Sequence, residues 1–444
     1  MRIDKIKIEN FKNYENLEVE FEKGINLFVG SNGSGKTSIL EAINIAIGGF
    51  FGEQEQKMQR GIDISEARIV IVNGEPMRMP KTSITAYSDI IKKPWTRNFN
   101  SKTKNNDQKF LKPAGEYGNK ILEGFYKTNY EIAPLLAFYS TKRLFKDSSQ
   151  SSKQKYDPLS GRRNGYLQCL KDNAIKETLL DWLGSSVTTR ATKQIKGVEF
   201  IDLILENVDK SITKTLLYFN EELKEEEIKI YQEVKFNYQV FLQLNPGFAL
   251  PINYYSDGFR NLLYLIMDLI WRASQLNPWL TLEQLSEQQT GCVTIDEIDL
   301  HLHPKWQAKT IGILQELLPN VQFFITTHSP MVVANFKQRE DVNKNSLDCL
   351  FILDNNTLSK VGTSYFGKDL NSVLRNPMGG NIRAKEVSEI LNHFYNIAEN
   401  PDSTEEELDS LAAIALELNN LLDGTDSEVI KVNAIVELLN AKKQ

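Results

Sequence analysis

The hydrophobic pattern near the start of the chain predicts a buried strand that leads directly into a helix. Residues 25–29 (INLFV) form the short apolar run that is typical of an internal strand. Further along, apolar residues recur at helical spacing at Ile39, Ile43 and Ile47. The stretch between them is GSNGSGKT, residues 30–37, so the pattern predicts a strand, a tight glycine loop and a helix in that order.

Later apolar runs predict further buried elements. The short runs within residues 291–295 and 321–330 indicate two more buried strands, and each ends in polar residues. Residues 262–271 (LLYLIMDLIW) belong to a long apolar helix, and amphipathic helices are predicted around 167–183 and 198–217.

The last part of the chain has a helical pattern throughout. About four short amphipathic helices are predicted after residue 364. Thr404 followed by Glu407 forms a good capping box at the start of one of them. The predicted apolar stripe of that helix consists of Leu408, Leu411, Ile414, Leu418 and Leu421.

The composition of the chain predicts where in the cell the protein is located. The chain has 444 residues and three widely separated cysteines, so it shows no CxxC zinc pattern or disulfide framework, and we expect a cytoplasmic protein. The longest apolar run is too short to span a bilayer, so no membrane association is expected. The net charge is −6, but between Lys385 and Lys431 there are twelve acids and no Lys or Arg, which leaves the remainder mildly basic.

The glycine loop fits the pattern GxxxxGK[ST], which holds nucleotide phosphates. Its glycines let successive main-chain amides face a phosphate, reinforced by the positive end of the following helix. Lys36 is expected to reach the β- and γ-phosphates of ATP, and the hydroxyl of Thr37 to hold Mg²⁺. The predicted phosphate-binding residues are Gly30, Ser31, Asn32, Gly33, Ser34, Gly35, Lys36, Thr37 and Ser38.

A nucleotide at this loop also needs a carboxylate for the metal and a base for the attacking water. The stretch CVTIDE supplies Asp296, predicted to reach Mg²⁺ through its water shell, and Glu297, predicted to be the general base. Such positioned proton transfer is typically worth about 10²–10⁴-fold in rate. His328 is the second predicted catalytic residue, because it could hydrogen-bond the γ-phosphate or its water; the alternative is a loop histidine satisfied by backbone groups.

The residues after Glu297 allow a different interpretation. Asp296, Asp299, His301 and His303 could be the ligands of a metal-dependent hydrolase, since two histidines two residues apart share one face of a strand. Pro304, however, fits the first turn of a helix. That placement favours structural or dimer-contacting roles for the two histidines.

Together these motifs resemble the ABC-type ATPase heads of the RecF, SMC and OLD group. The opening KIKIENFKNYENLEVEFEKGINLFVGSNGSGKT is similar to their first strands, with residues 11–14 in the position of their NFRNY motif. The DE pair at 296–297, the IDLHLHP run and the TTHSP stretch at His328 complete the likeness. The resemblance implies an α/β fold: an ABC-ATPase head with a P-loop NTPase sheet, an antiparallel β subdomain and a helical lobe, plus a C-terminal helical domain.

The same resemblance implies a signature loop that serves the opposite subunit. The candidate is YYSDGFRNLLYLIMDLIW, although three residues depart from the LSGGQ pattern. Ser256 would donate to the γ-phosphate of the neighbour's ATP, and Gly258 would allow close backbone approach. Asp299 takes the D-loop position and would touch the partner. These roles imply a head-to-head homodimer, or a higher homo-oligomer, with ATP between the two faces.

On the same grounds the chain is expected to have four parts. These are an ATPase lobe with Walker A and the β subdomain at 1–145, a helical insertion at 146–245, a second ATPase lobe with signature, Walker B, D-loop and H-loop at 246–363, and an acidic helical domain at 364–444. The insertion is too short for a long coiled-coil arm. Lys142 and Arg143 stand where these ATPases carry the Q-loop, so no Q-loop residue is assigned.

The combination is similar to the PtuA-like ATPases of Septu and some retron anti-phage systems. In that family an HNH endonuclease, PtuB, is encoded alongside. The resemblance therefore implies an ATPase whose slow, regulatory hydrolysis controls a partner nuclease in trans. The alternative is a DNA-repair or chromosome-maintenance ATPase of the RecF type.

Two basic stretches suggest a nucleic-acid partner. Residues 92–112 are rich in Lys and Arg with one acid, Asp107, and have Trp95 and Phe99 interleaved; a second basic stretch covers 142–163. Basic loops commonly hold phosphate backbones, so DNA or a retron RNA–DNA hybrid is a candidate partner. A solvated loop is the alternative.

One more pattern suggests an intrinsic ribonuclease. Lys385, Glu389 and His393 are four residues apart and would share a helical face. The triad resembles that of RNA-cleaving anticodon nucleases attached to similar ATPases, which use Arg at the first position. A solvated helix face is the default interpretation.

Overall fold

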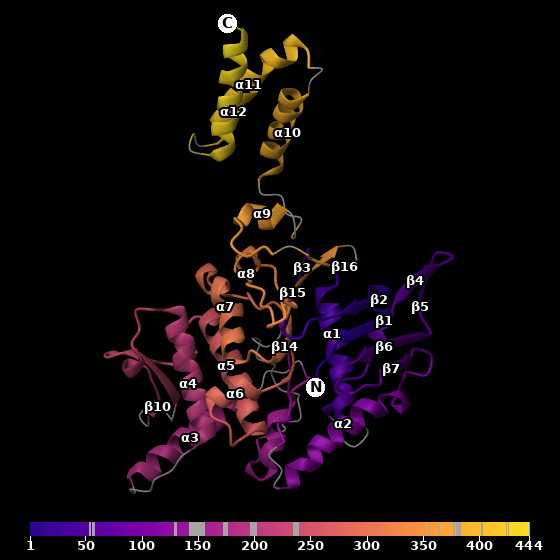
Figure 1. Cartoon of the computed structure of the whole chain (residues 1–444), viewed down its shortest axis with the longest axis vertical. Helices are drawn as coiled ribbons and strands as arrows, with labels where there is room; N and C mark the ends of the chain where they lie inside the picture. Colours follow the sequence, from indigo (N-terminus) through magenta and orange to yellow (C-terminus); the bar gives the residue numbers. More distant parts are fainter. Residues whose placement is uncertain are drawn as a thin grey trace. The chain divides into compact units, whose positions relative to one another are not determined.

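The chain forms two compact units, Met1–Val373 and Leu374–Gln444 (Figure 1). Each is described by itself. The computed structural model describes residues 1–52, 55, 58–127, 131–141, 156–171, 176–195, 202–233, 239–354, 356–362, 364–375, 378, 383–400, 403–422, 424 and 426–443.

A six-stranded sheet is the centre of the larger unit. In spatial order its strands are β16 (Thr357–Lys360), β15 (Cys349–Asp354), β3 (Ile25–Gly30), β14 (Val321–Thr326), β13 (Gly291–Ile295) and β9 (Leu135–Tyr139). All neighbours pair in parallel except β16, which is an antiparallel edge strand. The strands β3, β13 and β14 are buried along their whole length, as their continuous apolar runs predict. Their carboxyl ends meet at one edge of the sheet.

A second, antiparallel sheet supplies the β subdomain. Its spatial order is β2 (Tyr14–Glu20), β1 (Lys5–Phe11), β6 (Lys81–Tyr87), β7 (Trp95–Asn100) and β8 (Asn105–Asp107). Beside it, β4 (Ile69–Val72) and β5 (Glu75–Arg78) form a separate two-stranded hairpin. Its turn, at Asn73 and Gly74, has positive φ at both residues, as short hairpin turns favour.

Helix α1 (Lys36–Ile47) packs between the two sheets. It contacts β3, β13 and β14 of the parallel sheet and β1, β6 and β7 of the antiparallel sheet. Its apolar side chains are fully buried, which agrees with the helical spacing seen in the sequence. The helix that follows the glycine loop is therefore held on both sides, so the position of the loop is determined by the core.

The basic stretch at 92–112 is part of the antiparallel sheet. Trp95 and Phe99 on β7 are buried, and the Trp95 indole donates to the Ala46 carbonyl oxygen of α1 at 2.8 Å. The idea that these aromatic rings are interleaved with the lysines on a binding surface is therefore wrong, because alternation along the strand turns them into the core. Arg97 is buried as well, and lysines such as Lys102 remain exposed.

The larger unit also contains several helices. They are α2 (Lys112–Glu123), α3 (Lys176–Ile195), α4 (Leu203–Phe219), α5 (Asp257–Leu276), α6 (Leu282–Gln288), α7 (Pro304–Leu317) and α8 (Pro330–Ala334). Helix α4 packs against α5 and α7 (Figure 1). Helix α5 contacts β9 of the central sheet. The larger unit also has a small antiparallel sheet that the hydrophobic pattern does not predict. It consists of β10 (Lys229–Glu233), β11 (Gln239–Asn245) and β12 (Phe248–Pro251).

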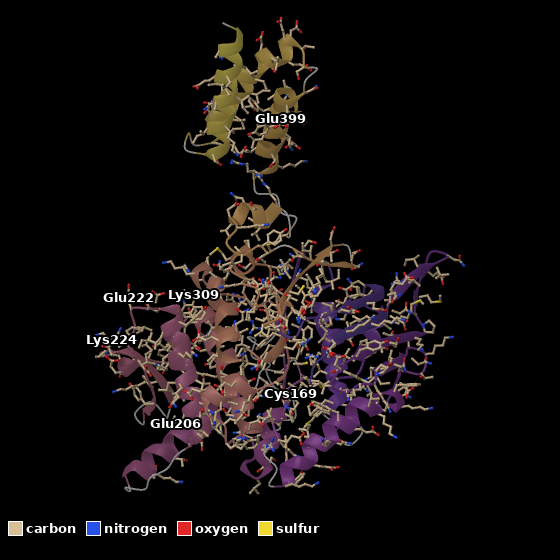
Figure 2. All side chains as sticks on the ribbon, in the orientation of Figure 1. Cys169, Glu206, Glu222, Lys224, Lys309 and Glu399 are labelled. Atoms are coloured by element: carbon tan, nitrogen blue, oxygen red, sulfur yellow. The ribbon has the colours of Figure 1, made fainter. Side chains whose placement is uncertain are left out.

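The first of the two predicted insertion helices begins later than expected. Residues 167–170 form a turn rather than a helix, and α3 starts at Lys176. The main-chain carbonyl of Cys169 accepts from Phe138 of β9 at 2.8 Å, and that of Leu170 accepts from Asn44 of α1 at 3.1 Å. A helix would need those carbonyls for its own hydrogen bonds, so the contacts with the core favour the turn. Cys169 is buried in the larger unit (Figure 2).

The smaller unit is helical. Helix α9 (Leu370–Arg375) crosses the boundary between the units, and α10 (Lys385–Glu399), α11 (Glu405–Leu421) and α12 (Ser427–Lys443) follow. The predicted capping box is present, because Thr404 and Glu407 bond each other's main chain. Leu411 and Leu418 are buried, but Leu421 is 54% exposed, contrary to the predicted stripe. The helix ends at that residue, and the next residue, Leu422, packs on the core instead.

Candidate functional site

The glycine loop between β3 and α1 is closed by a lysine. Gly33 and Gly35 have φ of 80° and 103°, a region that glycine enters without the cost of a side chain. The ammonium of Lys36 donates to the carbonyl oxygens of Gly30 at 2.9 Å and Ser31 at 2.8 Å. The lysine therefore folds back over the loop from which it starts.

Lys36 is only 5% exposed. Burial lowers its pKa below the ordinary 10.5, and the carboxylates of Asp296, Glu297 and Asp299 act in the opposite direction. A cation held partly out of water interacts with an anion more strongly than a solvated one does. The position suits a residue that must bind phosphate oxygens.

Tyr14 supports the loop from the β subdomain. Its buried hydroxyl donates to the Gly35 carbonyl oxygen at 3.1 Å. A side chain on Gly35 would overlap that hydroxyl, so the close approach requires glycine. The preceding residue, Asn13, bonds Asn356 in the turn between β15 and β16. The FKNY segment thus connects the first strands to the glycine loop.

The ends of β13 and β14 bring a carboxylate against the loop. Asp296 is 2% exposed. Its Oδ2 accepts a hydrogen bond from Thr37 Oγ1 at 3.0 Å, and its Oδ1 accepts from Thr326 Oγ1 at 2.6 Å. The structure therefore brings together Thr37 and Asp296, the two residues that the sequence assigns to the metal, although they are 259 positions apart.

Glu297 begins the turn after β13 and has an unusual backbone. Its φ is +48°, in the left-handed region that few residues other than glycine adopt. Its main-chain N–H donates to Thr326 Oγ1 at 2.8 Å. Burial lowers the pKa of Lys36 and of His328, and the charge of Glu297 partly opposes that lowering in both cases.

His328 and Asp299 meet on the other side of this turn. Asp299 Oδ1 accepts from Thr327 Oγ1 at 2.5 Å and from the main-chain N–H of His328 at 3.3 Å. Burial lowers the pKa of His328 below its ordinary 6.5, and the positive charge of Lys36 adds to the effect. The imidazole is thus neutral at pH 7, and can both accept and donate a hydrogen bond.

The two earlier histidines do not form a metal centre with these acids. His303 is the N-cap of α7, and its Nδ1 accepts from the Lys305 main-chain N–H at 3.3 Å. His301 is exposed. Among the described residues, no group of three or more His, Cys, Asp or Glu side chains is placed to hold a metal ion. The metal-dependent hydrolase interpretation therefore has no geometric support.

The candidate signature residues lie at the start of α5. Ser256 is the exposed N-cap, and its hydroxyl makes no capping hydrogen bond to the helix. Gly258 is buried in the first turn, where a Cβ would overlap the His301 carbonyl oxygen. The close approach at Gly258 is thus made to the loop after Glu297 in the same chain.

A cavity of about 830 Å³ opens beside α1 on the side of the β subdomain. Glu41, one turn after Thr37, lines it together with Lys12, Asn13 and Arg60. Glu41 forms ion pairs with Lys12 and with Arg60. The cavity is large enough for a small-molecule ligand group.

Other candidate residues lie away from these groups or outside the described part of the chain. Lys385, Glu389 and His393 are exposed on α10, and the first two form an i,i+4 ion pair at 3.7 Å. That arrangement agrees with a solvated helix face. Lys142 and Arg143, at the expected Q-loop corner, lie outside the described residues, as does most of the second basic stretch.

The sequence motifs predict no role for Thr326, Thr327 or Tyr14. The two threonines stand directly before His328, and their position in the chain alone does not indicate a contact with the acidic pair. A useful signal would have been the pair of hydroxyl residues at a buried strand end, opposite an acidic pair at the end of the neighbouring strand. The hydroxyl of Tyr14 gives no comparable sequence signal.

No helix in the described part of the chain has the length and apolar character needed to cross a membrane.

Residues 5–239 match the family model described as AAA domain. The chain is 23% identical to the retron Vc95 probable ATPase of Vibrio cholerae serotype O1 biovar El Tor, over 89% of this chain and 83% of that protein. It is also 23% identical to the Septu protein PtuA of Bacillus thuringiensis, over 74% of this chain and 72% of the relative.

Among solved structures, a crystal structure titled as the SmcHead bound to the C-winged helix domain of ScpA aligns with a TM-score of 0.46 and 14% identity. It covers 82% of this chain and 98% of its own. The family model spans just over half of the chain and includes the glycine loop. The chain therefore belongs to the AAA domain family and is a nucleotide-binding ATPase.

Proposed function

We propose that residues 30–38 bind the phosphates of ATP with Mg²⁺, and that Glu297 and His328 promote hydrolysis. The supporting observation is the 3.0 Å hydrogen bond between Thr37 and Asp296. It joins the hydroxyl of Thr37 at the loop to the carboxylate of Asp296, which follows β13 and directly precedes Glu297. Oxygen ligands of this kind are what Mg²⁺ uses in phosphate-transfer sites.

In this proposal each residue has one task. Lys36 and the main-chain amides of the loop bind the phosphate oxygens. Thr37 and Asp296 hold Mg²⁺, which neutralises charge on the phosphates when bound. Glu297 accepts a proton from the attacking water, and neutral His328 orients that water or the γ-phosphate by a hydrogen bond. The cavity beside Glu41 is our candidate for the nucleoside.

Two substitutions test these roles. Glu297→Gln should keep ATP binding and lower hydrolysis by about 10²–10⁴-fold, the usual contribution of a positioned base. Lys36→Ala should lose binding, measured with labelled ATP at equilibrium. Glu316→Gln, on α7 outside the site, is the control. Unchanged turnover in Glu297→Gln would contradict the assignment of the base.

We also propose that two copies sandwich ATP head to head, with Ser256 of one copy facing the phosphates bound by the other. The exposed hydroxyl at the start of a 20-residue helix supports this, because a helix N-terminus favours anions. Asp299 would lie near that interface. The ATPase lobes would be 1–145 and 246–363, with the insertion 146–245 and the acidic domain 364–444 attached.

Mixing two inactive variants tests the sandwich. Lys36→Ala and Ser256→Ala should each be inactive alone. A mixed dimer has one site with both defects and one intact site, so mixing should restore about a quarter of the wild-type rate if subunits exchange freely. A Lys36→Ala plus Glu297→Gln mixture is the control, because those residues share one P-loop face and a mixed dimer holds no intact site. No recovery in the first mixture, with exchange verified, would contradict the sandwich.

The cellular role that we propose is control of a partner nuclease in an anti-phage system. The likeness to a retron ATPase and to a Septu protein supports it. The partner would be a PtuB-like HNH protein acting in trans. Co-expression with the neighbouring open reading frame should protect cells from phage only when Lys36 is intact. Protection by the Lys36→Ala variant would contradict ATP control.

A second candidate is direct nucleic-acid binding of the RecF type, to DNA or a retron RNA–DNA hybrid. The exposed lysines Lys92, Lys93, Lys102, Lys104 and Lys109 on one subdomain favour it. Replacing Lys102 and Lys104 with Gln should weaken binding and flatten its dependence on salt, by a slope of about 0.9 per phosphate contact on duplex DNA. Gel shifts at several salt concentrations measure this.

A further inference from the structure

We propose that Thr326 is a positioning residue for ATP hydrolysis, because its single hydroxyl holds both the Asp296 carboxylate and the main chain of Glu297. The inference rests on the proposed function and deepens it. The sequence motifs assign no role to this side chain. Its importance follows from the geometry at the ends of β13 and β14.

The direction of both hydrogen bonds is determined by chemistry. The main-chain N–H of Glu297 can only donate, so the Thr326 oxygen accepts that bond at 2.8 Å. A hydroxyl has one proton, which is then donated to Asp296 Oδ1 at 2.6 Å. A buried carboxylate at 2% exposure accepts such a bond strongly. The Thr326 hydroxyl thus donates to Asp296, the acid that we assign to Mg²⁺, and accepts from the main chain of Glu297, the proposed base.

The hydrogen bond from Thr326 to Asp296 determines which oxygen of that carboxylate faces the glycine loop. With Oδ1 held by Thr326, Asp296 presents Oδ2 to Thr37 Oγ1, which lies 3.0 Å away. A carboxylate without the first bond could rotate about its side-chain torsion. Thr326 therefore orients the group that we assign to Mg²⁺.

The bond to Glu297 supports an unfavourable backbone. A φ of +48° at a residue with a side chain costs free energy, and such conformations persist only where surrounding contacts impose them. The N–H of this residue points at Thr326 Oγ1, and the next N–H, of Ile298, donates to the Thr326 carbonyl oxygen at 3.1 Å. Thr326 therefore accepts hydrogen bonds from two successive main-chain amides, those of Glu297 and Ile298, in the turn that carries the proposed base.

Thr326 is itself firmly held. It is fully buried at the end of β14 and pairs with Phe28 on β3, the strand that leads into the glycine loop. Its branched Cβ restricts the side-chain rotamer. The hydroxyl is therefore fixed to the same sheet that positions the phosphate-binding loop. The hydroxyl of the next residue, Thr327, donates to Asp299 and not to Asp296.

The test is Thr326→Val, which keeps the shape of the side chain and removes the hydroxyl. Loss of an outer-shell partner of this kind typically costs about 10–100-fold in activity or metal affinity, so kcat should fall by about that factor. The KM for ATP should change little, because Lys36 and the loop amides are untouched. Thr326→Ser should restore kcat to near the wild-type value.

A second readout does not depend on turnover. Binding of Mn²⁺ in the presence of a non-hydrolysable ATP analogue, followed by electron paramagnetic resonance, should be weaker in Thr326→Val and near normal in Thr326→Ser. Thr294→Val is the matched control, because Thr294 is a fully buried threonine on β13. Among the residues that the structure describes, its hydroxyl bonds only the main-chain oxygen of Ala137, at 3.4 Å. This substitution should leave kcat and Mn²⁺ binding unchanged.

If the valine variant does not fold, Thr326→Ser and Thr326→Ala form a second pair that differs only by the hydroxyl. Wild-type kcat in the variant without a hydroxyl would overturn the proposal, and so would an equal loss in Thr294→Val or in Thr326→Ser. These results are distinct from failure of the proposed function. That failure would appear as a wild-type protein that does not hydrolyse ATP at all.

Discussion

The imidazole of His328 lies among groups that move its pKa in opposite directions. Burial and Lys36 lower that pKa, whereas Glu297, Asp299 and Asp296 raise it, and the net direction is downward from 6.5. The folded state therefore binds a proton at this site less readily than the unfolded chain does. Stability linked to His328 is fully present above pH 6.5 and is lost as the pH falls below that value.

This sign gives a measurable prediction. Between pH 8 and pH 5, the melting temperature of the wild type should fall more than that of His328→Gln, because the variant has no group to protonate there. Thermal melts of both proteins across that range measure the difference. The substitution His393→Gln, at an exposed position on α10, should behave like wild type. A difference that grows with rising pH would contradict a lowered pKa.

For single residues, the sequence predicts those parts of the site whose residues are close together in the chain. Gly33, Gly35 and Lys36 lie in one short loop, and their spacing alone indicates a phosphate site. The contacts of Thr326 join residues 30 positions away on another strand, so no local pattern reveals them. The positive φ of Glu297 is equally hidden, because it arises from how two strand ends meet rather than from the residue type.

Among the elements, α5 depends on one small residue in its first turn. A methyl group at Gly258 would overlap the His301 carbonyl oxygen, which is main chain and cannot rotate away. Gly258→Ala should therefore displace the start of α5 or the loop after Glu297. Overpacking of this kind typically costs about 1–3 kcal/mol, so both the melting temperature and the ATPase rate should fall.

The matched control for that prediction is Gly362→Ala. A side chain there meets no atom of the described part of the chain within 4 Å, so stability and activity should stay at the wild-type level. Calorimetry and a steady-state ATPase assay measure both variants. A Gly258→Ala protein with an unchanged melting temperature would show that the first turn of α5 is less closely packed than described.

Elements with a strong hydrophobic period could be predicted, and those decided by tertiary contacts could not. The runs that became β3, β13 and β14 are apolar at nearly every position, as buried parallel strands require. Residues 167–170 also have helical spacing, but their carbonyls bond β9 and α1 and they form a turn. The strands β10, β11 and β12 are short and were missed because neighbouring helices dominate the pattern of that region.

For the whole molecule, the division into two compact units predicts that the smaller unit can lose stability without destabilising the larger one. Phe394 is fully buried in a core shared by α10, α11 and α12. Phe394→Ala should cost about 3–5 kcal/mol, which is a large share of what so small a helical unit can supply. We expect faster hydrogen exchange throughout α10–α12 and an ATPase rate close to wild type.

Hydrogen exchange with mass spectrometry, together with an ATPase assay, checks this prediction. Leu416→Ala is the control, because Leu416 is 63% exposed on α11. Equal loss of protection in the central sheet would show that the two units unfold together. The sequence indicated an acidic helical segment at this end of the chain, but the packing partners of its stripe, such as Leu422 in place of Leu421, required the structure.

The neighbours of β3 also have a consequence for biosynthesis. The strand is made within the first 30 residues, yet it lies between β14 and β15, whose residues follow about 300 positions later. At roughly 5–20 residues per second, a ribosome needs about 15–60 s to supply them. During that interval the apolar strand β3 has no neighbouring strands to pair with. We therefore expect the nascent chain to be prone to aggregation and to chaperone binding at the segment that precedes the glycine loop.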